Sequence, residues 1–208
     1  GTLPGLDVDP FDAYCEHLLV RTRSDGDRPP RVVGTYRLLT PLGAQRAGGL
    51  YADAEFSLNR LDHLRPRMAE VGRACVDPAW RGGAAMLLLW SALAQFMHHN
   101  GLTHMIGCAS VPMHDGGHAA ASLWAGLRRS HLAEPALAVQ PRLPLPLQAL
   151  RSNLPVAPPP LLAGYLRCGA RLLGPPAWDP DFGTADLPLM LRLDDLPPAY
   201  RRRFDLPA

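Results

Sequence analysis

Lysine is missing from the sequence, so all 21 basic side chains are arginines, against 19 acidic ones and a formal net charge of +2. So balanced a charge lacks the basic stripe that binding to a phosphate backbone requires, which argues against a nucleic-acid-binding protein. Arginine in place of lysine, with abundant alanine, leucine and proline, is typical of the codon bias of a GC-rich genome. The arginine content by itself therefore says nothing about function.

Signals for metal binding, membrane insertion and secretion are also missing. No C-x-x-C pair or His/Cys spacing of a zinc site occurs, so we expect reduced thiols in a cytoplasmic protein without a metal. The longest apolar run, residues 84–97, is shorter than the roughly 20 residues that span a bilayer and indicates a buried helix. The opening GTLPGLDVDPFD is polar and turn-rich, unlike a signal peptide. The four cysteines are Cys15, Cys75, Cys108 and Cys168.

The length and the hydrophobic content favour one domain. A chain of 208 residues with 47% hydrophobic residues can build one real core but hardly two. We therefore expect a single domain over residues 1–208, with its core at residues 9–130 and an apolar, proline-rich C-terminal region at residues 131–208.

The first half of the sequence predicts strands followed by a long helix. The β-rich runs at residues 17–22 and 31–40 are separated by the turn-forming string SDGDRPP, which predicts an antiparallel hairpin. Residues 67–76 are expected to form a third strand, which stops at an Asp-Pro pair. A glycine-containing loop then leads to a helix over residues 84–100, which Gly101 closes.

The second half alternates strand and helix before it becomes rich in proline. Residues 102–110 have the length of a buried strand, and residues 117–127 are expected to be helical. The prolines of residues 133–160 exclude a helix or a central strand, so this stretch is expected to be irregular. The order predicts an α/β (α+β) fold with a mixed central sheet flanked by helices. Further elements are expected at residues 160–169 (a short helix), 187–193 (a last strand) and 198–204 (a basic turn).

Six segments of the sequence resemble the characteristic segments of one enzyme family, in their residue types and in their order along the chain. They are DPFDAYCEHLLV, VVGTYRLL, EVGRACVDPAWR, LLLW, GCAS and PPLLAGYLRCGA, and they run from Asp9 to Ala170. The family is that of the L-ornithine Nα-acyltransferases, often labelled hemolysin-like. The resemblance implies a GNAT-like fold and an N-acyltransferase of ornithine-lipid synthesis. Such an enzyme moves a long-chain 3-hydroxy fatty acyl group from acyl carrier protein to the α-amine of L-ornithine, giving lyso-ornithine lipid.

A more remote resemblance, to the acyl-homoserine-lactone synthases, points to site residues. That family also takes acyl groups from acyl carrier protein, and its pattern includes early acidic residues, an arginine after a strand glycine, and a Glu-x-x-Arg strand. The resemblance also implies that the usual N-terminal strand and helices, which help to close the acyl-donor site, are absent from these 208 residues. The matching residues are Asp12 and Glu16, Arg37, and Glu70 with Arg73.

Amide formation from a thioester needs an amine with a free lone pair, and therefore a proton acceptor. Glu70 lies on the strand before the glycine-containing loop, where related enzymes hold a carboxylate that draws the ammonium proton, often through water. We expect Glu70 to be the general base. An ion pair of Glu70 with Arg73 or Arg37 is the alternative, and both can hold together. We also expect the strand of Glu70 and the strand around Cys108 to diverge in a V that admits the pantetheine arm.

Charged side chains are the candidates for binding the acceptor. Asp12 and Glu16, four residues apart, would present two carboxylates to a cationic amino acid such as ornithine, whereas composition alone favours a solvated helix turn. Arg37 and Arg73 would grip the substrate carboxylate or brace the general base, because a guanidinium offers a planar bidentate fork.

The loop before the long helix is the candidate site for the donor's phosphate. Arg81, Gly82 and Gly83 precede a helix N-terminus, where backbone N–H groups and the helix dipole attract anions. The usual pattern Arg/Gln-x-x-Gly-x-Gly/Ala is broken at Ala84 and Met86, which disfavours coenzyme A and favours the single phosphate of a carrier-protein arm. A plain glycine turn is the alternative.

Two histidines superficially resemble metal ligands. His114 and His118 are four residues apart, but Gly116 and Gly117 between them indicate a loop, and no third ligand is sensibly spaced. We therefore expect no metal.

The apolar C-terminal stretch and the surface arginines are the candidates for contacts with partners. The apolar residues 133–162 are expected to fold on the core or to make brief peripheral contact with the inner membrane face. Competing functions are an acyl-homoserine-lactone synthase, a short-chain acetyltransferase, and a non-catalytic lipid- or partner-binding domain. The arginines that could meet an acidic carrier protein are Arg128, Arg129, Arg201, Arg202 and Arg203.

Overall fold

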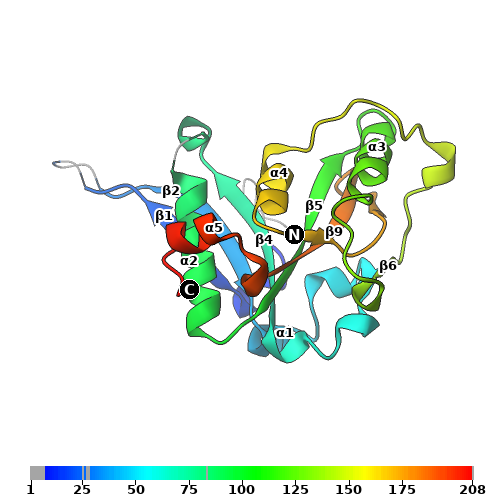
Figure 1. The fold of residues 1–208 in the computed structure, drawn as a ribbon. Helices are drawn as coiled ribbons and strands as arrows, with labels where there is room; N and C mark the ends of the chain where they lie inside the picture. Colours follow the sequence, from blue (N-terminus) through cyan, green and yellow to red (C-terminus); the bar gives the residue numbers. More distant parts are fainter. Residues whose placement is uncertain (1–7, 25, 27–28, 83, 208) are drawn as a thin grey trace.

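A mixed β-sheet forms the centre of the molecule (Figure 1). The computed structural model describes residues 8–24, 26, 29–82 and 84–207. Six of its seven strands pair in the order β1-β2-β4-β5-β9-β7, and the seventh, β8, pairs with β9. All these pairs are antiparallel except β4 with β5, which is parallel. The strands are β1 (Glu16–Arg21), β2 (Val32–Leu39), β4 (Met68–Val76), β5 (His104–Pro112), β7 (Arg171–Leu172), β8 (Ala177–Asp179) and β9 (Thr184–Arg192).

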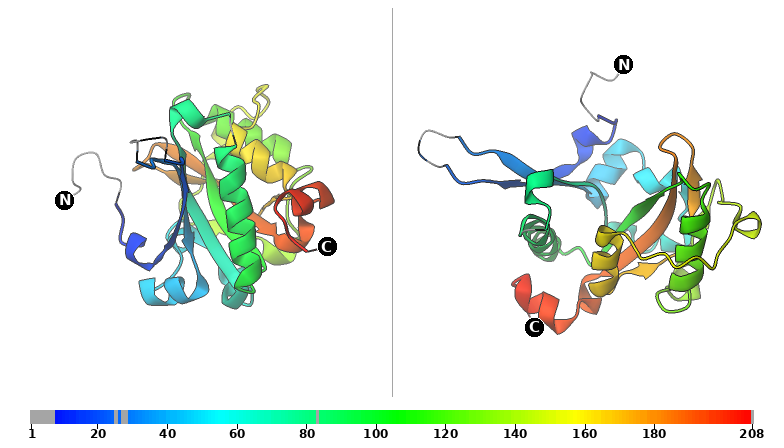
Figure 2. Two further views of the ribbon diagram at one scale, coloured as in Figure 1. Left: turned by 90° about the vertical axis from the view of Figure 1, so that its left-hand side faces the viewer. Right: turned by 90° about the horizontal axis from the view of Figure 1, so that it is seen from above.

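Four of the helices cover one face of the sheet, and the short helix of residues 41–47 lies with a chain of short turns on the other (Figure 2). Helix α2 lies along β1, β2 and β4, and its buried side chains join a core that also takes in α3, α4 and α5. A smaller core on the opposite face is built largely from residues 50–68. The helices are α1 (Pro41–Ala47), α2 (Ala85–His99), α3 (His118–Leu127), α4 (Pro160–Arg167) and α5 (Pro198–Arg203), and a separate two-stranded sheet pairs β3 (Phe56–Ser57) with β6 (Gln140–Pro141).

Most of the expected elements are confirmed. The hairpin is β1 and β2, with His17 opposite Arg37, and the long apolar helix is α2, followed by Gly101 at φ +66°. Residues 133–160 are irregular apart from β6 and short 3₁₀ turns. The basic turn at residues 198–204 is the short helix α5. The last strand begins at Thr184, earlier than expected, because β9 continues through Pro188.

The parallel pair of β4 and β5 opens into a V, as expected. The two strands pair only where Met68–Glu70 faces His104–Ile106, and both continue well beyond that point without pairing to each other. The vertex is tight, because a Cβ atom at Gly107 would lie 2.5 Å from the backbone oxygen of Val71. The cleft described below lies in the mouth of this V.

Beyond the vertex, β4 bulges. Its register against β2 shifts between Thr35 and Arg37, and Arg73 has φ +51°, in the left-handed region. A non-glycine residue in that region costs on the order of 1–3 kcal/mol, and such strain gathers at functional sites. The bulge presents the Arg73 side chain to the cleft.

Candidate active site

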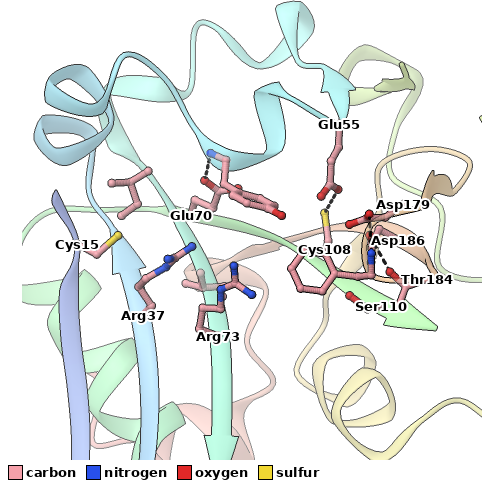
Figure 3. A pocket seen from close by; sticks show the side chains of 15 residues that line it. Cys15, Arg37, Glu55, Glu70, Arg73, Cys108, Ser110, Asp179, Thr184 and Asp186 are labelled. Atoms are coloured by element: carbon pink, nitrogen blue, oxygen red, sulfur yellow. Dashed lines mark hydrogen bonds between the residues drawn. The ribbon is translucent and has the colours of Figure 1, made fainter. Parts of the chain in front are cut away.

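Glu70 stands at the vertex of the V and is only 8% exposed. Its carboxylate accepts hydrogen bonds from the backbone N–H groups of Tyr51 (2.6 Å) and Ala52 (2.8 Å) in a 3₁₀ turn, Tyr51–Asp53 (Figure 3). Burial raises the pKa of Glu70 to about 7, although the two hydrogen bonds act in the opposite direction. A carboxylate with a pKa near neutrality is suited to general base catalysis.

Arg37 and Arg73 share one carboxylate. Arg37 Nη1 donates to Asp9 Oδ2 (2.6 Å) and to Asp12 Oδ1 (2.8 Å), and Arg73 Nη2 donates to the same Asp9 oxygen (3.0 Å). Burial alone would raise the pKa of Asp9, but the hydrogen bonds from both arginines outweigh it and lower that pKa. These contacts anchor the arginines beside Glu70, whose own hydrogen bonds run to backbone N–H groups rather than to either guanidinium.

Asp12 and Glu16, expected to bind the acceptor together, lie on opposite sides of the sheet. Asp12 lies in a 3₁₀ turn and binds Arg37, so it takes part in the site through that arginine. Glu16 is exposed on β1 and stands opposite Leu38, whose side chain belongs to the core under α2. Because side chains alternate along a strand, Glu16 lies on the face of the sheet opposite Arg37.

A cavity of about 270 Å³ connects these groups. Glu70, Arg37 and Arg73 line it, and the Arg73 guanidinium lies 5.6 Å from the ring centroid of Phe182 and 5.9 Å from that of Tyr51. The cavity therefore offers a proton acceptor next to two guanidinium groups, within the mouth of the V.

The other end of the cavity is acidic, and the sequence analysis did not anticipate it. Glu55, Asp179 and Asp186 each offer a carboxylate oxygen, and the three oxygens lie within 4.8 Å of one another. Burial, and then the nearby Asp186, raise the pKa of Glu55 to about 7, and burial also raises the pKa of Asp186. Cys108 Sγ donates to Glu55 Oε2 at 3.5 Å. The three carboxylates come from distant segments, so no sequence spacing could have revealed them.

Small apolar cavities continue from the cleft toward the helical face. One of about 30 Å³ shares Val71 and Cys108 with the cleft, and one of about 20 Å³ follows it, with Met105, Tyr165 and Leu191 common to both. Two polar groups are buried along this route. The hydroxyl of Tyr165 is hydrogen-bonded to that of Tyr36, and Trp90 Nε1 has no hydrogen-bond partner in the part of the chain that the structure describes.

The loop expected to bind the donor's phosphate lies in front of α2. Arg81 is exposed and donates through Nε to the backbone oxygen of Val76 (3.0 Å), and Gly82 has φ +80°. Gly83 lies outside the described residues. Helix α2 begins at Ala85, and no side chain of a described residue caps its N-terminus. Phosphate binding at this loop stays a prediction.

Of the two histidines near α3, His118 makes a structural contact. His118 Nδ1 accepts from the backbone N–H of Arg151, and Asp115 accepts from the backbone N–H groups of Gly117 and Ala119 at the start of the helix. All four cysteines are free thiols. Among the described residues, no helix is long and apolar enough to cross a membrane.

A sheet that opens beside a buried glutamate, with two arginines in the opening, defines an acyltransferase of the GNAT class, and sequence comparison agrees. Residues 1–91 match the family described as Acetyltransferase (GNAT) domain. The L-ornithine Nα-acyltransferase of Rhizobium meliloti (strain 1021) is 34% identical over 93% of this chain and 69% of that protein. The L-ornithine Nα-acyltransferase of Brucella abortus (strain 2308) is 32% identical over 93% of this chain and 73% of that protein. The chain therefore belongs to the L-ornithine Nα-acyltransferase family and is an amino-acid N-acyltransferase.

Solved structures confirm the fold. A coenzyme A-dependent acyl-homoserine lactone synthase, BjaI, bound to SAM and isopentyl-CoA, matches with a TM-score of 0.51 and 18% identity. The match covers 100% of this chain and 73% of BjaI. The structure of BjaI with MTA matches over the same shares with a TM-score of 0.52. The expected GNAT-like mixed sheet flanked by helices is thus confirmed.

Proposed function

We propose that the protein transfers a long-chain 3-hydroxy fatty acyl group from acyl carrier protein to the α-amine of L-ornithine, giving lyso-ornithine lipid. The observation that carries the proposal is the placement of Glu70, with a pKa of about 7, at the vertex of the V and in one cavity with Arg37 and Arg73. The names of the relatives support ornithine as the acceptor.

The reaction begins with removal of a proton from the acceptor. The α-ammonium group gives a proton to the Glu70 carboxylate, directly or through water, and the amine lone pair then attacks the thioester carbonyl carbon. A C–N bond forms and the carbonyl oxygen becomes an oxyanion, which backbone N–H groups in the mouth of the V can stabilise. The C–S bond then breaks, the amine nitrogen loses its remaining extra proton, and the pantetheine sulfur leaves as a thiol.

Arg73 and Arg37 orient the acceptor. The guanidinium of Arg73 lines the cavity and is held by Asp9, so its planar fork is positioned before an amino-acid carboxylate arrives. Such positioning reduces the entropic cost of bringing amine and thioester together. The arginines therefore have a binding role, and Asp9 and Asp12 act through them.

The donor is proposed to be acyl carrier protein. Ala84 and Met86 stand where a coenzyme A pyrophosphate loop usually has glycine and glycine or alanine, which favours a donor with a single phosphate. The apolar route from Val71 to Leu191 supports a fatty acyl group, whose chain would widen the two small cavities there. Brief contact with a membrane surface would follow from the lipid nature of the product.

The test is mass spectrometry of lipids from cells that express the full-length protein. We expect new lipids consisting of one 3-hydroxy fatty acid in amide linkage to ornithine. Cells that express the Glu70→Gln variant should lack them, whereas the matched Glu134→Gln variant, altered at an exposed glutamate, should make them. The absence of any acylated amino acid from cells with the unaltered protein would refute the proposal.

A further inference from the structure

Three carboxylates meet at the end of the cleft away from Arg37. Glu55 precedes β3, Asp179 ends β8 and Asp186 lies on β9, and Figure 3 shows them grouped around Cys108. Their oxygens lie within 4.8 Å of one another. Like charges this close repel strongly where water is scarce, so this arrangement needs a positive partner to be stable in its ionised form.

One oxygen of the buried Asp186 carboxylate lacks a hydrogen-bond donor among the described residues. Asp186 is only 3% exposed, and its Oδ1 has no hydrogen-bond partner among the described residues. Its Oδ2 accepts from Thr184 Oγ1 at a long 3.3 Å, and the Ser110 and Thr184 hydroxyls only partly offset the rise that burial causes in the pKa of Asp186. A buried oxygen without a donor is costly, so the site is incomplete without a ligand that donates hydrogen bonds.

The position of the cluster shows which ligand is suitable. The same cavity carries Arg37 at one end, Glu70 and Arg73 in its middle, and the three carboxylates at the other end. An amino acid whose side chain bears an ammonium group has charges that match these three kinds of group. Its carboxylate would face Arg73, its α-amine would face Glu70, and its side-chain cation would reach the acidic end.

We propose that Glu55, Asp179 and Asp186 form the subsite for the side-chain ammonium of a diamino-acid acceptor and thereby determine acceptor specificity. An ammonium group has three N–H donors, one for each carboxylate. A neutral side chain of equal length would leave the carboxylates unneutralised, so the site selects against it as well as for the diamino acid. This inference rests on the proposed N-acylation of an amino acid.

The test compares L-ornithine with L-norvaline, which has the same carbon chain without the side-chain amine. With 3-hydroxyacyl carrier protein as the donor, the unaltered full-length enzyme should have a kcat/KM at least about a hundredfold higher for ornithine. Asp186→Asn and Glu55→Gln should each reduce this ratio at least tenfold. The matched control is Asp181→Asn, at an exposed position in the turn between β8 and β9, and it should retain the ratio.

A binding measurement accompanies the kinetics. Ornithine should raise the melting temperature of the unaltered enzyme more than norvaline does, and this difference should vanish in both variants. Melting curves also show whether each variant is folded. If Asp186→Asn or Glu55→Gln does not fold, Asp179→Asn, at a half-buried position, takes its place in the test.

The outcomes separate the two proposals. If the unaltered enzyme acylates no amino acid, the proposed function fails. If it acylates ornithine but the ratio is unchanged in the variants, only the subsite assignment is overturned. Loss of ornithine acylation on chelator treatment, with recovery on adding Mg²⁺ or Mn²⁺, would also overturn the assignment, because the carboxylates would then bind a metal ion.

Discussion

Replacement of Glu70 by glutamine should change both the stability and its dependence on pH. The pKa of Glu70 rises from 4.5 to about 7 in the folded protein. The folded state therefore holds the proton more tightly than the unfolded state, and stability falls as pH rises from about 4.5 to 7. A shift of this size corresponds to about 3 kcal/mol, and the glutamate is buried enough for the conversion to apply.

Glu70→Gln abolishes this titration but carries a cost of its own. The glutamine amide has one acceptor oxygen for two backbone donors, Tyr51 and Ala52, so one donor is left without a partner at a cost of about 1–3 kcal/mol at every pH. The variant should thus be less stable than the unaltered protein at pH 5. By pH 8 the difference should have moved by about 2.5 kcal/mol in favour of the variant, because part of the shift is already lost at pH 5.

Urea unfolding followed by circular dichroism at pH 5 and pH 8 measures this difference. Glu134→Gln serves as the control, and its stability should follow that of the unaltered protein at both pH values. If the free energies of unfolding of Glu70→Gln and of the unaltered protein differ by the same amount at pH 5 and pH 8, the raised pKa of Glu70 is refuted. Initial rates at neutral pH complete the test, because loss of the general base should lower acylation on the order of a hundredfold.

Three further predictions concern the frame of the site and its donor. Asp9→Asn leaves the buried guanidinium of Arg37 with one carboxylate fewer, so the free energy of unfolding should fall by about 3 kcal/mol in denaturant titrations. Gly107→Ala should cost more than about 2 kcal/mol because its Cβ would meet the backbone oxygen of Val71, whereas Gly72→Ala, which meets nothing within 4 Å, should be nearly neutral in the same assay. Acylation should be faster from carrier protein than from acyl coenzyme A, with a preference that shrinks as salt rises, since surface charge is screened over about 8 Å at physiological ionic strength. Equal rates from both donors at low salt would contradict the proposed donor.

The strands and the long helix could be predicted because they depend on local patterns. The apolar run closed by Gly101 specifies α2, and the β-rich runs around SDGDRPP specify the hairpin. The V between β4 and β5 followed from the family resemblance, since no local pattern encodes the loss of pairing beyond Glu70. The turn that binds Glu70 is a 3₁₀ turn of three residues, too short to show a periodicity.

The candidate site was predicted only in part, for reasons of topology. Glu70, Arg37 and Arg73, which the resemblance to the acyl-homoserine-lactone synthases pointed to, meet in one cavity. Glu16 falls on the other face, because its partner across the hairpin is Leu38 and alternation then fixes its direction. The cluster of Glu55, Asp179 and Asp186 depends on the β8–β9 hairpin folding back toward the V, which is a tertiary event.

The central claim is that the acceptor's α-amine is acylated in the cleft beside Glu70. Tandem mass spectrometry of the product from purified full-length enzyme, 3-hydroxyacyl carrier protein and L-ornithine tests it most directly, because fragment masses locate the acyl group on one nitrogen. The account predicts acylation of the α-nitrogen, at a rate on the order of a hundred times lower in Glu70→Gln. Acylation of the side-chain nitrogen, or an undiminished rate in the variant, would contradict it.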